Sequence, residues 1–98
     1  MVNALDFSHP YLRSMPDPRT PEILAWLENL PLTQRLATLH AMSFAFPRLE
    51  NDRQWIRRID AVREELQPTA AQHADILFEA GSISLRLKRQ LSASEPAR

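Results

Sequence analysis

Residues 32–46 read LTQRLATLHAMSFAF, and Arg35 is the only residue among them with a formal charge at neutral pH. On a helical projection, one side carries apolar or small residues at positions 32, 36, 39, 43 and 46. The other side carries alanines at positions 37, 41 and 45, with His40 and Phe44 beside them. A helix that is apolar nearly all round is buried nearly all round. This stretch therefore predicts a central helix around which the rest of the chain packs.

Capping residues and prolines mark a shorter helix before the central one. Thr20, Pro21 and Glu22 combine a capping hydroxyl, a proline at the first helical position and an acid near the positive end of the helix dipole. The apolar positions that follow share one face until Pro31 stops the run. This pattern predicts a first helix from about residue 20, separated by Pro31 from the central helix at about 32–46.

The helix after the central one contains a tryptophan among arginines. It is predicted over about residues 49–66, with a start at Asn51 or Asp52 and an end before Pro68. At 100° per residue, Trp55 lies within about 40° of the apolar residues at 59, 62 and 66. We therefore expect the tryptophan to belong to the core rather than to a ligand-binding surface.

A fourth helix is predicted from about Ala70 to Leu91, because TAAQ at residues 69–72 has the spacing of a capping box. This segment carries two apolar stripes: Ala70, Ala74, Leu77, Phe78, Gly81 and Leu85 on one side, and Ile76, Ala80, Ile83, Leu87 and Leu91 on the other. One stripe suffices for the home core, so we expect the second, from 76 to 91, to be covered by something else. Residues 82–88 also alternate like a strand, but a lone strand has no partner here, so the helix is favoured.

The ends of the chain differ from the helical region in composition. Four of the eight prolines lie in the first 21 residues, which predicts an extended arm over residues 1–19. Its apolar residues indicate that it wraps its own domain or docks on another chain. Residues 92–98 are predicted to form a flexible tail. The predicted fold is thus all-α: a compact bundle of about four helices over residues 20–91, with a Pro-rich N-terminal arm.

Composition narrows the function classes. Hydrophobic residues make up 44% and charged residues 24% of the 98 residues, values typical of a single globular domain. Twelve basic residues balance twelve acidic ones, so the chain lacks the net positive charge of most non-specific nucleic-acid binders. It contains no cysteine, no secretory signal pattern and no apolar run long enough to span a membrane. We expect a soluble, cytoplasmic protein that does not act at a membrane.

Recognisable catalytic or cofactor-binding motifs do not occur in the sequence. The histidines at 9, 40 and 73 have no metal-binding spacing, no GxSxG elbow is present, and a chain with one glycine has no phosphate-cradling loop. We therefore expect neither enzymatic activity nor a cofactor nor a metal. His40 is expected to be partly buried and bonded to a nearby carbonyl; the alternative is a pH-sensitive group at an interface.

Two surfaces are predicted to bind another protein. Arg53, Arg57 and Arg58 crowd the first half of their helix, where they oppose the helix dipole, and they could pair with an acidic surface. The second stripe of the last helix supplies the apolar partner-binding residues Ile76, Ile83, Leu87 and Leu91. The predicted function is a small, non-enzymatic protein-binding module, an adaptor, inhibitor, chaperone or subunit. Two ways of covering the second stripe are considered, a second copy of the chain and the N-terminal arm, and homodimerisation is preferred.

The alternative function is a helix-turn-helix DNA-binding regulator. It would place a first helix at residues 70–79, a turn at Gly81, and a recognition helix at residues 83–91. The residues that would contact DNA are Ser84, Arg86, Lys88 and Arg89. Residues 82–98 carry four basic side chains and one acidic one, which favours this alternative locally. The residues around Gly81 match poorly the residue types that usually flank such a turn, so protein binding is preferred.

Overall fold

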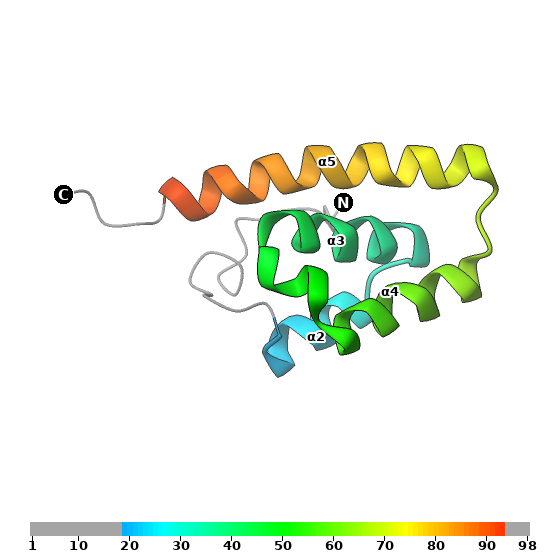
Figure 1. The fold of residues 1–98 in the computed structure, drawn as a ribbon, viewed down its shortest axis with the longest axis horizontal. Coiled ribbons are helices and arrows are strands. Elements are labelled where there is room, and N and C mark those ends of the chain that lie inside the picture. The colour runs from blue at the N-terminus through cyan, green and yellow to red at the C-terminus, as the bar shows by residue number, and fades with distance from the viewer. Residues whose placement is uncertain (1–18, 94–98) are drawn as a thin grey trace.

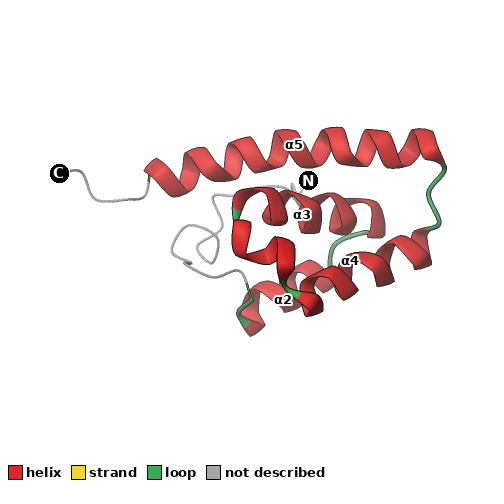
Figure 2. Ribbon diagram, in the orientation of Figure 1, coloured by secondary structure: helices red, strands yellow, loops and turns green. Residues whose placement is uncertain are grey.

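The computed structural model describes residues 19–93 (Figures 1 and 2). Within this range it contains four α-helices, a short 3-10 helix and no strand. The elements are α2 (Pro21–Glu28), α3 (Leu32–Ala45), η1 (Pro47–Asn51), α4 (Arg53–Leu66) and α5 (Ala70–Ala93). The all-α prediction is confirmed. Apart from Arg19, the predicted N-terminal arm lies outside the described residues, as do residues 94–98 of the predicted tail.

The helices form three layers with α3 in the middle (Figure 1). Helix α5 runs along one side of α3, while α2 and α4 lie on the other side. Helix α3 contacts every other element, whereas α5 contacts only α3 among the elements of the described chain. Because α5 has one neighbour among the described elements, the side chains on its side away from α3 are available to other molecules.

Helix α3 is buried almost all round, as its sequence predicts. Seven of its residues are buried: Leu36, Ala37, Thr38, Leu39, Ala41, Met42 and Ser43. These positions point in most directions around the helix axis, because α5 covers one side and α2, α4 and η1 cover the other. Phe44 is among the exposed residues of this helix, and His40, one turn before it, is half-buried. The central position of residues 32–46 is confirmed.

The predicted helix starts are made by the expected hydrogen bonds. The Thr20 hydroxyl accepts a hydrogen bond from the backbone N–H of Ile23 at the start of α2. At the start of α5, the backbone N–H of Gln72 donates to the Thr69 hydroxyl at 3.1 Å. The Thr69 N–H donates in return to the Gln72 side-chain oxygen at 2.9 Å, which completes a capping box.

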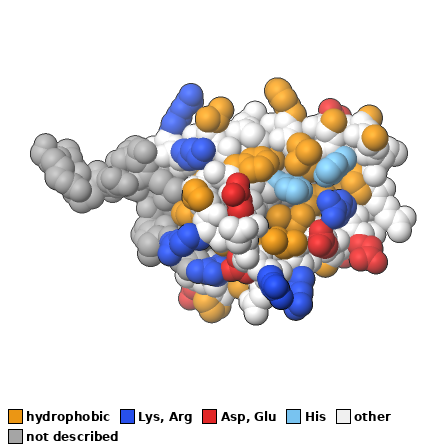
Figure 3. Space-filling view, in the orientation of Figure 1, with side chains coloured by type: hydrophobic (Ala, Val, Ile, Leu, Met, Phe, Trp, Pro, Cys, Tyr) orange, Lys and Arg blue, Asp and Glu red, His pale blue; other side chains and the backbone are white. Residues whose placement is uncertain are grey.

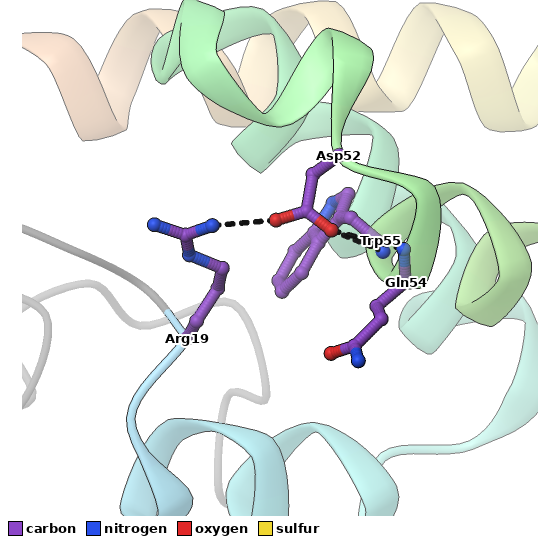
Figure 4. Close-up of polar contacts among 4 residues, drawn as sticks. All are labelled: Arg19, Asp52, Gln54 and Trp55. Carbon is purple, nitrogen blue, oxygen red and sulfur yellow. Dashed lines mark hydrogen bonds and ion pairs between the residues drawn. The ribbon is translucent and has the colours of Figure 1, made fainter.

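The start of α4 is fixed by Asp52 (Figure 4). One oxygen of its carboxylate accepts hydrogen bonds from the backbone N–H groups of Gln54 and Trp55, at 2.9 and 3.1 Å. The other oxygen pairs with the Arg19 guanidinium at 2.5 Å. The hydrogen bond from Trp55, followed by the bond from Arg19, lowers the pKa of Asp52 below its usual value. The predicted third helix therefore divides: residues 47–51 form η1, which buries Leu49, and α4 begins after Asp52.

Trp55 is fully buried, which confirms its predicted place in the core. It belongs to a cluster that draws side chains from all the layers, including Ile23 and Leu27 of α2, and Ile83 and Leu87 of α5. Helix α5 passes through Gly81 without interruption, so the helical prediction for residues 82–88 is confirmed. The helix continues to Ala93, two residues beyond the predicted end at Leu91.

Candidate partner-binding surface

Helix α5 has an inner side that belongs to the core. Ile76, Ala80, Ile83 and Leu87 recur every three or four residues, and each is at most 4% exposed. Because α3 is the only element that α5 contacts in the described chain, these side chains pack in the layer between α5 and α3. Three residues predicted to bind a partner, Ile76, Ile83 and Leu87, are therefore core residues. The side chain of Leu91 lies outside the described part of the structure.

The two stripes of α5 are used in the opposite way from the prediction. Both stripes are apolar by residue type, but the side chains of Ile76, Ile83 and Leu87 on the inner one are those buried in the structure. The prediction that the stripe from 76 to 91 needs an outside partner is wrong for its described residues, and the stripe through Phe78 and Leu85 is the one left uncovered.

The outer face of α5, which we define as Ala74, Phe78, Gly81 and Leu85, points away from α3. At 100° per residue, Phe78 and Leu85 lie about 170° from the centre of the inner side. Phe78 is 79% exposed and Leu85 is 55% exposed. In the space-filling view, hydrophobic side chains protrude along the top of the molecule, where α5 lies (Figure 3). The outer face is an apolar helix surface with no partner among the described residues.

Gly81 lies in the middle of the outer face, and nothing within the described chain requires a glycine there. Its backbone does not have positive φ. A Cβ atom built at this position would meet nothing within 4 Å. Glycine within a helix costs about 1 kcal/mol relative to alanine, so this residue lowers the stability of α5 without a compensating contact among residues 19–93. A glycine at this position would, however, allow the backbone of another molecule to approach α5 closely.

A pair of histidines lies beside an exposed phenylalanine on the face shown in Figure 3. The rings of His40 and His73 meet edge to face with centroids 6.1 Å apart. The Phe44 ring stacks on His40 at 6.3 Å. Each histidine has a buried Nε2 atom without a hydrogen-bond partner. The partial burial expected for His40 is confirmed, but its Nε2 atom does not make the expected hydrogen bond to a carbonyl.

The histidine pair has electrostatic consequences. Burial, followed by the proximity of His73 and of the Arg63 guanidinium, lowers the pKa of His40 below its usual value of 6.5. The ring of His40 is therefore held in its neutral form when the protein is folded at neutral pH. The three groups come from α3, α5 and α4, so the tertiary fold creates this cluster.

The arginine cluster lies on a different side of the molecule. Arg53 and Arg57 are exposed on α4, Arg58 is half-buried, and none of the three forms an ion pair with a described residue. Arg57 and Arg58 border an open depression beside Ala61. Because α4 and α5 lie in the layers on opposite sides of α3, the structure does not join the arginines and the α5 residues into one surface.

A groove that the sequence did not reveal lies between the first halves of α3 and α5. Its volume is about 380 Å³, and its apolar lining includes Ala37, Leu66, Pro68 and Ile76. Thr33, Gln34, Gln72, Asp75 and Glu79 supply its polar lining. These residues come from α3, α4, α5 and the loop between α4 and α5. No sequence pattern could have brought them together, because their positions depend on how the layers stack.

The helix-turn-helix geometry is contradicted. Residues 70–93 form one unbroken α-helix, so the turn predicted at Gly81 does not exist. Ser84 is 5% exposed, and its hydroxyl donates to the Gly81 carbonyl oxygen at 2.9 Å, which leaves it unavailable for DNA contacts. Arg86, Lys88 and Arg89 are exposed. They form a basic segment on a continuous helix rather than a separate recognition helix.

No group of three or more histidine, aspartate or glutamate side chains in the described range could hold a metal ion. Among the described helices, none combines the length and the apolar character needed to cross a membrane. Comparison with known proteins gives no match to a family model, to a curated protein or to a solved structure.

Proposed function

We propose that this chain is a small, non-enzymatic protein-binding module and that the outer face of α5 is its main docking surface. The observation that supports this proposal most is the one-sided packing of α5. Its inner side is buried and faces α3, its one neighbour among the described elements, while Phe78 and Leu85 are exposed on the opposite side. Exposed apolar surface of this kind marks interaction sites on small proteins. The role that follows is that of an adaptor, inhibitor, chaperone or subunit.

The edge of α5 that leads toward α3 extends this surface. Leu77 is 36% exposed and Phe44 is 42% exposed, and the histidine pair lies in the same region. Aromatic side chains contribute much of the binding energy at protein interfaces, and two of the exposed apolar residues are phenylalanines. The proposed surface thus has an apolar centre with polar groups at its edge, which is the usual anatomy of an interface.

The arginine cluster on α4 is a second proposed contact site. Arg53 and Arg57 are exposed and have no acidic partner among the described residues. Guanidinium groups bind carboxylates in a bidentate manner, so an acidic protein surface is the matching partner. Since this site lies on the other side of α3 from α5, one compact partner would not reach both sites easily. Two partners, or one partner that wraps around the bundle, fit the layout better.

A photo-reactive amino acid introduced at Ser82, beside the outer face, tests the proposal in extracts of the native host. We expect a discrete cross-linked protein product that disappears when Phe78→Glu is added to the same chain. The control places the photo-reactive residue at Glu64, an exposed position on α4. Products that are identical at both positions, or that persist with Phe78→Glu, would argue against the outer face as the docking surface.

Nucleic-acid binding is the second candidate function, and the exposure of Arg86, Lys88 and Arg89 along one helix favours it. Salt dependence separates the two candidates. Binding driven by phosphate contacts weakens steeply as salt rises, whereas binding through an apolar surface does not. A duplex DNA that bound the chain with a steep salt slope, lost in Arg86→Gln and Arg89→Gln, would favour the second candidate over the first.

A cytoplasmic site of action is part of the proposal. The chain contains no cysteine, so its fold needs no oxidising compartment. Fractionation of the native host with an antibody against the chain checks this, and recovery in an extracytoplasmic fraction would contradict it.

A further inference from the structure

We infer that the outer face of α5 packs against the outer face of α5 in a second copy of this chain, with the two helices antiparallel and the two-fold axis beside Gly81 and Ser82. The inference rests on the proposed function, since it names the partner of the proposed docking surface. Three features of α5 carry it: the positions of its exposed apolar residues, the place of its glycine, and the order of its charges.

The apolar residues of the outer face are arranged symmetrically. Phe78 precedes the proposed axis and Leu85 follows it at the same distance along the helix. A two-fold axis between positions 81 and 82 therefore brings Phe78 of one copy onto Leu85 of the second copy, and repeats the contact in the opposite sense. An interface in which the same patch serves both copies must have this self-complementary arrangement.

The glycine lies at the point where the two helices would cross. Gly81 has no Cβ atom to separate the helix backbones, and an added Cβ would touch nothing among the described residues of its own chain. Close approach at this point allows the large side chains on either side, Phe78 and Leu85, to reach the opposite helix. Outside the dimer, the same glycine only weakens α5.

The charges on α5 favour the antiparallel direction. Its first half carries the acidic residues Asp75 and Glu79, and its second half carries the basic residues Arg86, Lys88 and Arg89. Glu79 and Arg86 pair with each other within the chain, 3.7 Å apart. In an antiparallel pair centred at 81–82, Asp75 of each helix lies beside Arg89 of the second copy. A parallel pair would bring like charges together and would also align the helix dipoles unfavourably.

The size of the contact sets its expected strength. A helix of 24 residues is about 36 Å long, and only one helix per copy contributes. Such a contact is smaller than the standard interface of about 1,600 Å². We therefore expect a reversible dimer with a dissociation constant of micromolar order rather than a permanent one.

Sedimentation velocity from about 5 to about 500 µM spans micromolar dissociation constants. We expect a shift from monomer to dimer, abolished by Phe78→Glu and by Leu85→Glu while the helical circular dichroism is retained. A matched control is Glu64→Lys, an exposed change on α4 that should leave the dimer unchanged. Wild-type protein that stays monomeric at the highest concentration overturns the inference.

Cysteine cross-linking tests the direction of the helices, because the chain contains no cysteine of its own. Asp75→Cys and Arg89→Cys proteins are oxidised separately and as an equimolar mixture. In the antiparallel pair, the mixture should give a disulfide-linked dimer of unlike chains in excess of either protein alone. Dimers that form equally well from each protein alone would indicate parallel helices and overturn the inference.

The two proposals fail in different ways. A monomer in sedimentation, together with a Phe78-dependent cross-link from Ser82 to a different protein, overturns the second-copy inference and supports the proposed function. If neither a dimer nor a Phe78-dependent cross-link is found, both proposals are wrong. A dimer of the described kind supports both.

Discussion

The indole N–H of Trp55 donates a hydrogen bond to the backbone carbonyl oxygen of Leu39, 3.1 Å away, inside the core. The hydroxyl of Ser43 donates to the same oxygen at 3.3 Å. This relationship joins α4 to α3 and gives the one polar group of the tryptophan a partner within the apolar interior. A buried tryptophan whose N–H is paired adds its large apolar area to stability without the cost of an unsatisfied donor.

Trp55→Ala should lower the free energy of unfolding by about 3 to 5 kcal/mol, because it removes the largest side chain of the core and leaves a cavity. Urea unfolding followed by far-ultraviolet circular dichroism measures the loss. Phe78→Ala, which removes an exposed aromatic ring, is the control and should change stability by less than about 0.5 kcal/mol. A near-neutral Trp55→Ala would place the tryptophan at the surface.

Two neighbouring aliphatic residues of α5 should differ sharply in their contribution to stability. Ile83→Ala should cost about 2 to 5 kcal/mol, since Ile83 is fully buried against the α3 layer. Leu85→Ala should cost less than about 0.5 kcal/mol in the monomer, because Leu85 points the other way. Denaturant unfolding at low micromolar concentration compares the two variants. Equal losses would mean that both sides of α5 are packed in the monomer.

Stability should fall as the pH decreases below about 6.5. The pKa of His40 is lower in the folded protein than in the unfolded chain, so the unfolded chain takes up protons first and is favoured as the pH falls toward the folded-state pKa. Thermal unfolding between pH 7.5 and pH 5 measures the slope, and His40→Gln should reduce it.

Acidic groups provide an internal check on the assignment to His40. The pKa of Asp52 is also lowered, but its contribution to stability is lost only below its usual value of 3.8, well outside the histidine range. A pH slope between 7.5 and 5 that persists unchanged in His40→Gln would show that another group causes it.

Reversal of the two exposed arginines, Arg53 and Arg57, to glutamate should leave the fold intact and change the free energy of unfolding by less than about 1 kcal/mol, since exposed charges contribute little. Adding Arg58→Glu, at a half-buried position, completes the triple variant. Affinity for an acidic protein partner, measured by isothermal titration calorimetry, should fall strongly. Glu64→Lys, an exposed charge reversal at the other end of α4, is the control. If the triple variant bound with unchanged affinity, the cluster would be an ordinary solvated helix face.

The sequence predicts the helices well because their signals are local. Thr20, Asp52 and the Thr69–Gln72 pair each make the capping bonds expected from residue type and spacing. The central position of α3 is also predictable, because a helix without a polar face has to be covered on all sides. The separate turn of η1 was not predicted, although Asp52, one of the two predicted capping residues, marks the start of α4 directly after it.

The use of the two stripes of α5 could not be predicted from residue type alone. The choice depends on which stripe fits the surface that α3 presents, and that surface exists only after folding. The histidine pair and the groove beside Asp75 were missed for the same reason, because their members come from elements that are far apart in the sequence. The DNA-binding alternative places a turn at Gly81, whereas residues 70–93 form one unbroken helix.

Thiol labelling most directly tests whether another polypeptide covers the outer face of α5. An Ala74→Cys variant carries the only thiol of the chain on that face, and an Ala25→Cys variant carries it on the exposed side of α2. We expect a maleimide to label both variants at equal rates in dilute solution. In concentrated protein or native host extract, labelling at position 74 should become at least about tenfold slower than at position 25, a degree of cover worth about 1.4 kcal/mol. Equal rates at both positions under all three conditions would contradict the docking role of the outer face.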